Sequence, residues 1–341
     1  MTDSELTLVI GATGFVGGAI LGHLQAAGRP VRALARSGRA ADDLLTRGAE
    51  AVPGDVLEPE SLAGAMHGCD VVYHAGGVNG FCLADPAHME RVNVDGSVNV
   101  IAAAARAGIR RVVYTSSAAA LGEAEGTVGD EQSAHRGWFL SHYERTKYEA
   151  EVRVLEEAAA RDVPVVCVSP SSVQGPGRLH GTARLVLRYV NGRLRFLVDT
   201  RMSFLDVADC AAGHLLAEDL GAPGERYVLN GGTFSARELI GMIAQVTDIS
   251  HPVTWLPGSA ALLAATAVEG AARVARRQPP VCREMIRTLL HGHAYDGSRA
   301  QRDLGVCYTP VPETILRTLR WYDEHGYLTR PLRAGGQGKA P

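Results

Sequence analysis

The sequence predicts an α/β protein with a doubly wound parallel sheet and a smaller lobe formed by its C-terminal part. A short apolar strand at Leu8–Ile10 runs into the glycine-rich turn Gly11–Gly17, and apolar strands then alternate with helical stretches. Strands that alternate with helices pair side by side in a parallel sheet. The alternation later stops, so we expect a sheet core at 1–177, a mixed region at 178–333 that returns strands to the core and forms the lobe, and a disordered tail at 334–341.

The glycine spacing of the first turn indicates a phosphate-binding site. Gly11 permits a sharp exit from the strand, Gly14 lets a pyrophosphate approach the backbone, and Gly17 lets the next helix pack close to the strand. Free N–H groups at the start of that helix would point at the anion. We expect a dinucleotide to contact this turn at Gly11, Thr13, Gly14, Phe15, Val16 and Gly17. The competing interpretation is an ordinary glycine-rich connection.

Composition and charge favour a small molecule as the partner. The 341 residues carry a formal net charge of −3 at pH 7, and acidic and basic residues are interspersed. Such a pattern indicates neither nucleic acid nor an anionic membrane as a partner. The chain enters its first strand without the charged and apolar segments of a signal peptide, so we expect a cytoplasmic protein.

The cysteines predict free thiols. The sequence has 6 cysteines: Cys69, Cys82, Cys167, Cys210, Cys282 and Cys307. They form no CxxC pair, and several of them lie within apolar stretches. This pattern is typical of reduced cytosolic thiols, so we expect neither a disulfide nor a zinc site. His291 and His293 form a His-Gly-His motif, but too few ligand residues accompany them in the sequence to predict a metal site.

The end of the second predicted strand, Arg29–Arg36, bears on the choice of cofactor. A carboxylate at this place usually holds the adenosine ribose of NAD. Here Ala35 offers no acceptor, whereas the guanidinium of Arg36 can pair with the 2′-phosphate of NADP(H). We therefore expect NADP(H), with an ordinary surface role for Arg36 as the alternative.

Four further strands are predicted at 49–54, 70–75, 111–115 and 164–169. Ligands of doubly wound folds bind where the carboxyl ends of such strands meet. His74 at one of these ends is expected to be structural rather than a ligand. Between the strands we expect a long helix at Met89–Ala107 and a functional loop at Gly122–Ser141.

Ser117, Tyr143 and Lys147 form a candidate catalytic set. Ser117 follows the strand at 111–115, and Tyr143 and Lys147 lie one turn apart on the next predicted helix. A ketone that accepts a hydride needs a proton on its oxygen, and a phenol with a pKa of about 10 is a poor acid-base partner at neutral pH. The Lys147 ammonium would favour the phenolate and hold the nicotinamide ribose, while the Ser117 hydroxyl would bind the substrate oxygen.

With these features the chain resembles the extended short-chain dehydrogenase/reductase family, in its dihydroflavonol reductase-like and 3β-hydroxysteroid dehydrogenase-like branch. The motifs that carry the resemblance are Gly11–Gly17, Gly54–Val56, His74–Gly76, Asn93–Gly96, Tyr114–Ser117, Tyr143–Lys147, Ser169–Gly177, Phe204–Asp209 and Gly224–Leu229. The resemblance implies a Rossmann fold, NADPH as cofactor, and Ser117 rather than Ser116 as the catalytic serine. Besides Arg36, Tyr143 and Lys147, it implies cofactor contacts from Asp55, Val56, Ala75, Gly76, Gly77, Asn93, Thr115, Pro170 and Val173.

Three places qualify the resemblance or lie outside it. Plant flavonoid reductases carry an asparagine five residues beyond the catalytic serine, where this chain has Gly122, so a flavonoid substrate is not expected. Asp206 stands where many members have histidine, and helix capping accounts for it. The apolar stretch Ala260–Ala275 is too short and too interrupted to span a bilayer, so we expect a buried or lid helix, with a membrane-surface helix as the alternative.

The leading hypothesis is an NADPH-dependent ketoreductase for a largely apolar, cyclic molecule such as a polyketide, steroid or terpenoid ketone. Trp138, Phe139 and the 260–275 helix would offer it apolar surface. A nucleotide-sugar epimerase or dehydratase is the alternative, with a diphosphate held by Arg178, Arg184, Arg188 and Arg193. Against it, Ala118–Ala120 stand where sugar dehydratases carry acid-base carboxylates. A non-catalytic NADP-binding sensor would have no need of Tyr143 and Lys147. A homodimer is compatible with all three.

Overall fold

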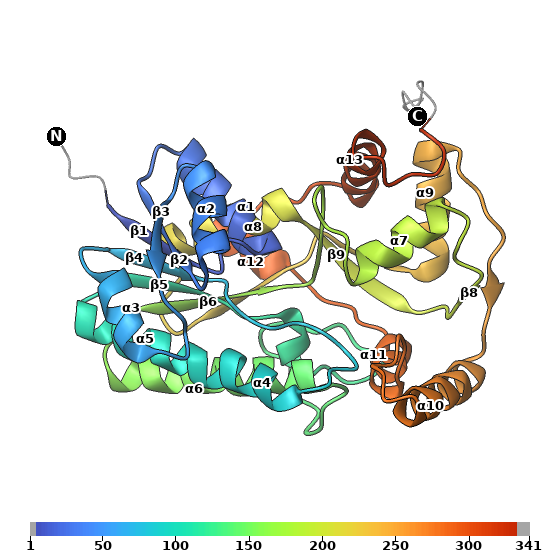
Figure 1. The fold of residues 1–341 in the computed structure, drawn as a ribbon, viewed down its shortest axis with the longest axis horizontal. Coiled ribbons are helices and arrows are strands. Elements are labelled where there is room, and N and C mark those ends of the chain that lie inside the picture. The colour runs from blue at the N-terminus through green and yellow to red at the C-terminus, as the bar shows by residue number, and fades with distance from the viewer. Residues whose placement is uncertain (1–4, 333–341) are drawn as a thin grey trace.

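The computed structural model describes residues 5–332 and consists of a sheet core and a smaller lobe (Figure 1). The core holds a 7-stranded sheet in the order β10-β6-β5-β4-β1-β2-β3. Its strands are β1 (Thr7–Ile10), β2 (Val31–Ala35), β3 (Glu50–Pro53), β4 (Val71–His74), β5 (Arg111–Thr115), β6 (Val165–Pro170) and β10 (Arg226–Leu229). Each neighbouring pair is parallel, which confirms the predicted doubly wound fold.

Helices cover both faces of this sheet. Successive side chains of a strand point to opposite faces, so a strand of consecutive apolar residues has two apolar faces to bury. In β1, Val9 packs into one apolar cluster, and Leu8 and Ile10 pack into the other. The Val9 face is covered by α1 (Phe15–Ala26), α2 (Gly38–Thr46), α8 (Val207–Leu220) and α12 (Ser298–Leu304). The opposite face is covered by α3 (Pro59–Met66), α5 (Gly96–Ala107) and α6 (His142–Ala160).

The long helix predicted at 89–107 is interrupted by a wider turn. It consists of α4 (Pro86–Glu90), the π-helical turn η1 (Arg91–Asp95) and α5. A π-turn within a helical run often marks a functional site. Here it carries Asn93, which is buried.

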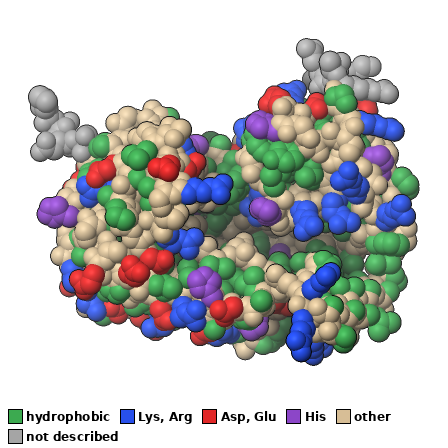
Figure 2. Space-filling view, in the orientation of Figure 1, with side chains coloured by type: hydrophobic (Ala, Val, Ile, Leu, Met, Phe, Trp, Pro, Cys, Tyr) green, Lys and Arg blue, Asp and Glu red, His purple; other side chains and the backbone are tan. Residues whose placement is uncertain are grey.

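The smaller lobe surrounds an apolar cluster of its own, which includes Tyr189, Phe204 and Tyr322. Its strands are β7 (Ser172–Gln174), β8 (Phe196–Leu197), β9 (Arg201–Asp206), β11 (Gly232–Ser235) and β12 (Thr254–Trp255). Its helices are α7 (Thr182–Val190), α9 (Ala236–Thr247), α10 (Gly258–Val274), α11 (Arg283–His291) and α13 (Val311–Glu324). Figure 2 shows a hollow between the lobe and the core.

Asp206 joins the two parts. Its carboxylate caps α8 by accepting a hydrogen bond from the N–H of Ala208 at 2.8 Å, as the sequence predicts. The same carboxylate accepts a hydrogen bond from Thr314 Oγ1 at 2.7 Å and pairs with Arg317, both on α13. Capping therefore also fixes α13 of the lobe against the start of a core helix.

The prediction that no disulfide forms is wrong. Cys82 and Cys282 are bonded across a sequence separation of 200 residues, with their Cα atoms 5.7 Å apart. The spacing of cysteines in a sequence does not show that the loop after β4 meets the start of α11. Disulfides persist in oxidising surroundings, so the cysteines no longer favour the predicted cytoplasmic location.

The stretch predicted as a buried or lid helix forms α10, and it is not buried. Only Ala261 and Ala265 of this helix are buried, whereas Leu263 is 74% and Val274 87% exposed. Within residues 5–332, no helix is long and apolar enough to cross a membrane. The predicted disordered tail at 334–341 lies outside the described residues.

Candidate active site

The glycine turn after β1 has a backbone that only glycine permits. Gly11 has a φ of +88°, and a Cβ atom there would lie 2.6 Å from the nitrogen of Gly76. A Cβ atom on Gly17 would lie 2.2 Å from the carbonyl oxygen of Gly11. Gly14 is the N-cap of α1, and no side chain of the described residues caps it. The first N–H groups of α1 therefore remain available, which fits the diphosphate of a dinucleotide.

The turns after β3 and β4 lie beside this glycine turn or near it. The N–H of Ala75 donates to the carbonyl of Ile10 at 2.9 Å, so the 75–77 turn touches the end of β1. Asp55 accepts a hydrogen bond from the N–H of Leu57 at 2.9 Å, which fixes the turn after β3. Val56 is buried and would collide with a Cβ atom on Gly96, at 2.7 Å. These predicted cofactor residues follow the carboxyl ends of β3 and β4.

Arg36 is exposed directly after β2, where an adenosine ribose is expected. The next residue, Ser37, caps α2 by accepting a hydrogen bond from the N–H of Ala40 at 3.3 Å. Arg39 in the first turn of α2 is exposed as well. The structure therefore places two arginines beside a helix start at this end of β2.

Ser117 and Tyr143 are brought together, as the sequence predicts. Ser117 is the N-cap of the short helix η2 (Ala118–Leu121), and Tyr143 lies in the first turn of α6. Burial raises the pKa of Tyr143, while the Ser117 hydroxyl and the charge of Arg178 act to lower it. Ser116, by contrast, is buried.

Lys147 is fixed to the sheet rather than to Tyr143. Its Nζ atom donates to the carbonyl oxygen of Thr115 at 2.8 Å and lies 5.1 Å from the centre of the Tyr114 ring. Burial lowers the pKa of Lys147 to about 8, against the opposing charge of Glu151. The charge of Arg178 also acts to lower the pKa of Tyr143, and the role predicted for Lys147 stays a prediction.

Arg178, which the sequence suggests only as a ligand for a sugar diphosphate, lies near Tyr143. Its guanidinium lies 5.4 Å from the centre of the Phe15 ring, so it links the glycine turn to Tyr143. The hydroxyl of Tyr322 donates to the Arg178 carbonyl at 2.7 Å and fixes this segment against α13. Spacing along the sequence carries no signal for this contact. The other arginines grouped with it, Arg184, Arg188 and Arg193, are exposed.

Asn93 connects the loop after β4 to α6. Its amide accepts a hydrogen bond from the N–H of Val78 at 2.7 Å and donates to the Val78 carbonyl at 2.9 Å. It also donates to Thr146 Oγ1 at 3.0 Å, on α6. Asn93 thus ties the loop after β4 to the helix that carries Tyr143, and its predicted cofactor contact stays a prediction.

The remaining predicted residues lie at or shortly after the carboxyl ends of β4, β5 and β6. Thr115 ends β5, and its Oγ1 atom lies 2.9 Å from His214 Nε2. Pro170 ends β6 and Val173 lies in β7, and both are buried. Burial lowers the pKa of His74 to about 3, so this imidazole is neutral, and its Nε2 atom lies 3.0 Å from Ser97 Oγ. These contacts suit the structural role predicted for His74.

The loop at 122–141 is held by Arg136. Its guanidinium pairs with Glu144 on α6, where both side chains are buried, and donates to the carbonyl of Glu123 at 3.1 Å. A Cβ atom on Gly122 would lie 2.1 Å from Cδ2 of His135. The asparagine of plant flavonoid reductases therefore has no room at this position.

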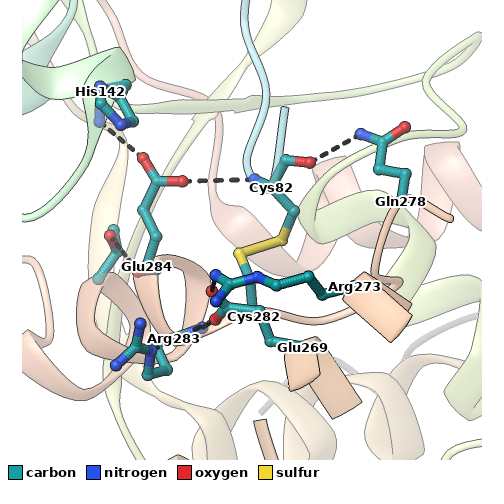
Figure 3. Close-up of a disulfide and its surroundings, with 9 residues drawn as sticks. Cys82, His142, Glu269, Arg273, Gln278, Cys282, Arg283 and Glu284 are labelled. Carbon is teal, nitrogen blue, oxygen red and sulfur yellow. Dashed lines mark hydrogen bonds and ion pairs between the residues drawn. A yellow bond between two sulfur atoms is a disulfide. The ribbon is translucent and has the colours of Figure 1, made fainter. Parts of the chain in front are cut away.

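The start of α6 also contacts the lobe through α11 (Figure 3). Glu284 accepts hydrogen bonds from the N–H groups of His142 at 2.6 Å and Cys82 at 3.3 Å. A cavity of about 850 Å³ lies here, with Phe139 in its wall. Its wall carries five arginines, Arg145, Arg273, Arg277, Arg283 and Arg287, and two carboxylates, Glu269 and Glu284. Glu269 pairs with Arg273 and Arg283, and Arg145 pairs with Glu90 outside the wall. This cavity is more basic than the apolar surface that the sequence analysis expects.

Comparison with known proteins assigns a family to this arrangement. The model of the NAD dependent epimerase/dehydratase family matches residues 7–229. A putative dihydroflavonol 4-reductase from Synechocystis sp. is 31% identical over 95% of this chain and 96% of its own. A ketoreductase of Stigmatella aurantiaca, named for 4-hydroxy-2-methyl-3-oxo-4-farnesyl-3,4-dihydroquinoline-1-oxide, is 31% identical over 96% of this chain and 99% of its own. The crystal structure of gox2253 superposes with a TM-score of 0.83 at 30% identity, covering 95% of this chain and 100% of that chain. The chain therefore belongs to the NAD-dependent epimerase/dehydratase family, within the extended short-chain dehydrogenase/reductase superfamily that its motifs predict.

Proposed function

We propose that the protein is an NADPH-dependent ketoreductase, which reduces a ketone on a largely apolar, cyclic small molecule to a secondary alcohol. The observation that carries the proposal is the meeting of Ser117, Tyr143 and Arg178 beside the glycine turn. A phenol, a hydroxyl donor and a cation in one place supply a proton and a stabilising charge to a reacting carbonyl.

The chain's own residues then have distinct roles. A bound nicotinamide would supply the hydride. Tyr143 gives its hydroxyl proton to the ketone oxygen, and Ser117 donates a hydrogen bond to the same oxygen and so polarises the carbonyl. Arg178 stabilises the phenolate that Tyr143 becomes, because its charge lowers the pKa of that phenol. Lys147, held by the Thr115 carbonyl, binds the ribose next to the nicotinamide.

The preference for NADPH rests on the end of β2. Ala35 offers no carboxylate to a ribose 2′-hydroxyl, and the exposed Arg36 can form a charge-assisted pair with a 2′-phosphate. Arg39 lies close by in sequence and can reinforce the positive charge. This supports NADPH over NADH.

The substrate class is supported from two sides. The relative from Stigmatella aurantiaca, similar over almost its whole length, is named for the reduction of a ring ketone that carries a farnesyl chain. Phe139 and Leu140 give the cavity at the start of α6 an apolar part, while its arginines suit an anionic group. We therefore propose an apolar ketone that carries a carboxylate or phosphate at some distance from the carbonyl.

Turnover of matched ketones tests this proposal. We expect NADPH consumption with cyclic ketones, and a lower KM for a ketone that carries a carboxylate than for its methyl ester. UDP- and dTDP-sugars form the second arm of the panel. Conversion of a nucleotide sugar without net NADPH consumption, together with no reduction of any ketone, would show that the protein is an epimerase instead.

A further inference from the structure

We propose that Glu123, His291 and His293 form a binding site for a divalent transition-metal ion such as Zn²⁺. Each residue offers one ligand atom, and these atoms all lie within 4.8 Å of one another. Glu123 is 1% and His291 8% exposed. This proposal does not depend on the proposed ketoreductase activity.

The three ligands come from both parts of the protein. Glu123 follows η2 in the core. In the lobe, His291 ends α11 and His293 comes shortly after it, 170 residues from Glu123 in the sequence. Glu123 Oε1 lies 2.6 Å from His293 Nδ1 and 3.9 Å from His291 Nε2. The sequence therefore shows only two ligands, and the third appears when the chain folds.

Gly292 turns both imidazoles to the same side. Its φ is +67°, a left-handed conformation that favours glycine. A Cβ atom there would lie 3.2 Å from Thr200 Oγ1, so the segment also packs tightly against the lobe. The two rings consequently lie 5.2 Å apart, centre to centre.

A second observation points to a ligand. Glu123 Oε2 is buried and has no hydrogen-bond partner among the described residues. A buried carboxylate oxygen without a partner is costly, and a cation would satisfy it. Two imidazoles and one carboxylate are a frequent ligand set of zinc, and they leave a fourth position for water.

Little movement is needed to admit the ion. Two ligands of a tetrahedral zinc ion, each bound at about 2.0–2.1 Å, lie roughly 3.3 Å apart. Glu123 and His293 would thus separate by well under 1 Å on that same estimate. Arg136 is the nearby charge that opposes a cation, and its buried pairing with Glu144 compensates for it. Two hydrogen-bond partners compete with the ion: the Tyr295 hydroxyl lies 3.1 Å from His293 Nδ1, and the Glu123 carbonyl oxygen lies 3.2 Å from His291 Nε2.

The bound ion would fasten the second end of α11. The Cys82–Cys282 bond already ties the start of this helix to the core. The ion would tie its end to Glu123, beside η2, which begins at the candidate catalytic serine Ser117. Tyr295 packs against Ala118 and Leu121 of η2, so the joined segment lies next to that serine. The site is therefore a structural clamp between lobe and core.

Metal titration of the full-length, untagged protein tests the proposal. The protein is treated with a chelator, dialysed, and titrated with Zn²⁺ in a calorimeter and with Co²⁺ by visible absorption. We expect one equivalent of metal and a rise in melting temperature with Zn²⁺. Glu123→Gln and His293→Gln should each weaken binding by more than about a hundredfold, because even groups behind a ligand matter tenfold to a hundredfold.

Two variants serve as controls. Tyr295→Phe keeps all three ligands and should bind Zn²⁺ like the unmodified protein, whereas a purely hydrogen-bonded cluster would lose a partner. His67→Ala removes an exposed histidine elsewhere and should change nothing. Circular dichroism checks that each variant is folded. Absence of Zn²⁺ binding by the unmodified protein, or equal binding by it and Glu123→Gln, would overturn the proposal.

Discussion

The two sides of the candidate active site are specified in different ways. On the core side, the glycine turn depends on close backbone approaches, such as that of Gly17 to the Gly11 carbonyl and that of Gly11 to Gly76. On the lobe side, the contacts join distant segments: Glu284 binds His142 across 142 residues, and Tyr322 binds Arg178 across 144. Backbone geometry therefore shapes the core side of the candidate site, whereas side-chain contacts between distant segments shape the lobe side.

The largest effect is expected at Tyr143, where the two sides meet. Tyr143→Phe removes the proton donor and little binding surface, so kcat should fall by about 10²–10⁴ while the Kd for NADPH stays nearly unchanged. Steady-state kinetics and fluorescence titration of NADPH measure the two quantities. Ser116→Ala, at a buried neighbour of Ser117, is the matched control and should keep its turnover. A normal kcat in Tyr143→Phe would refute the assigned proton donor.

The disulfide joins the two sides covalently, so its removal tests how much this bond contributes to the free energy of unfolding. Cys282→Ser opens a loop of 200 residues. Its loss should lower the free energy of unfolding by about 2–4 kcal/mol, because the unfolded chain regains entropy. Denaturant unfolding with and without dithiothreitol measures this, and Cys307→Ser, at an exposed free thiol, is the control. If reduction leaves the unfolding midpoint unchanged, the bond contributes nothing to holding α11 in place.

Cofactor preference tests the core side alone. Arg36→Ala should weaken NADPH binding about tenfold to a hundredfold, the loss of one charge-assisted hydrogen bond, and leave NADH binding unchanged. Adding Ala35→Asp should reverse the preference in favour of NADH. Dissociation constants for both cofactors provide the measurement. Should the unmodified protein bind NADH as tightly as NADPH, Arg36 is an ordinary surface residue.

The smallest effect is expected at Arg178, the lobe's contribution to the proton donor. Reduction needs a protonated Tyr143, so activity falls as the pH rises through the pKa of that phenol. Arg178→Gln removes a charge that lowers this pKa, so the alkaline fall in kcat should move upward by about one pH unit. Arg184→Gln, at an exposed arginine, should leave the profile in place. A downward shift in Arg178→Gln would contradict the assigned geometry.

The features that could be predicted from the sequence are those that depend on short-range patterns and on the fold class. The strands, the glycine turn and the closeness of Ser117 and Tyr143 follow from short-range pattern and fold class, and the structure has them. The contact of Arg178 with Phe15 and the Cys82–Cys282 bond could not be predicted, because each depends on how the lobe folds back onto the core. The apolar run of α10 predicts a buried or lid helix, yet Leu263 of this helix is exposed. Hydrophobicity alone does not show which face meets a partner.

In the proposed reaction, a hydride passes from NADPH to the carbonyl carbon of a ketone. Reduction with NADPH that is deuterated at the transferred position of C4, followed by mass spectrometry and NMR of the product, tests it most directly. We expect one deuterium at the carbinol carbon, with one NADP⁺ formed for each alcohol. A product without deuterium, or a nucleotide sugar converted with no net NADP⁺, would contradict it.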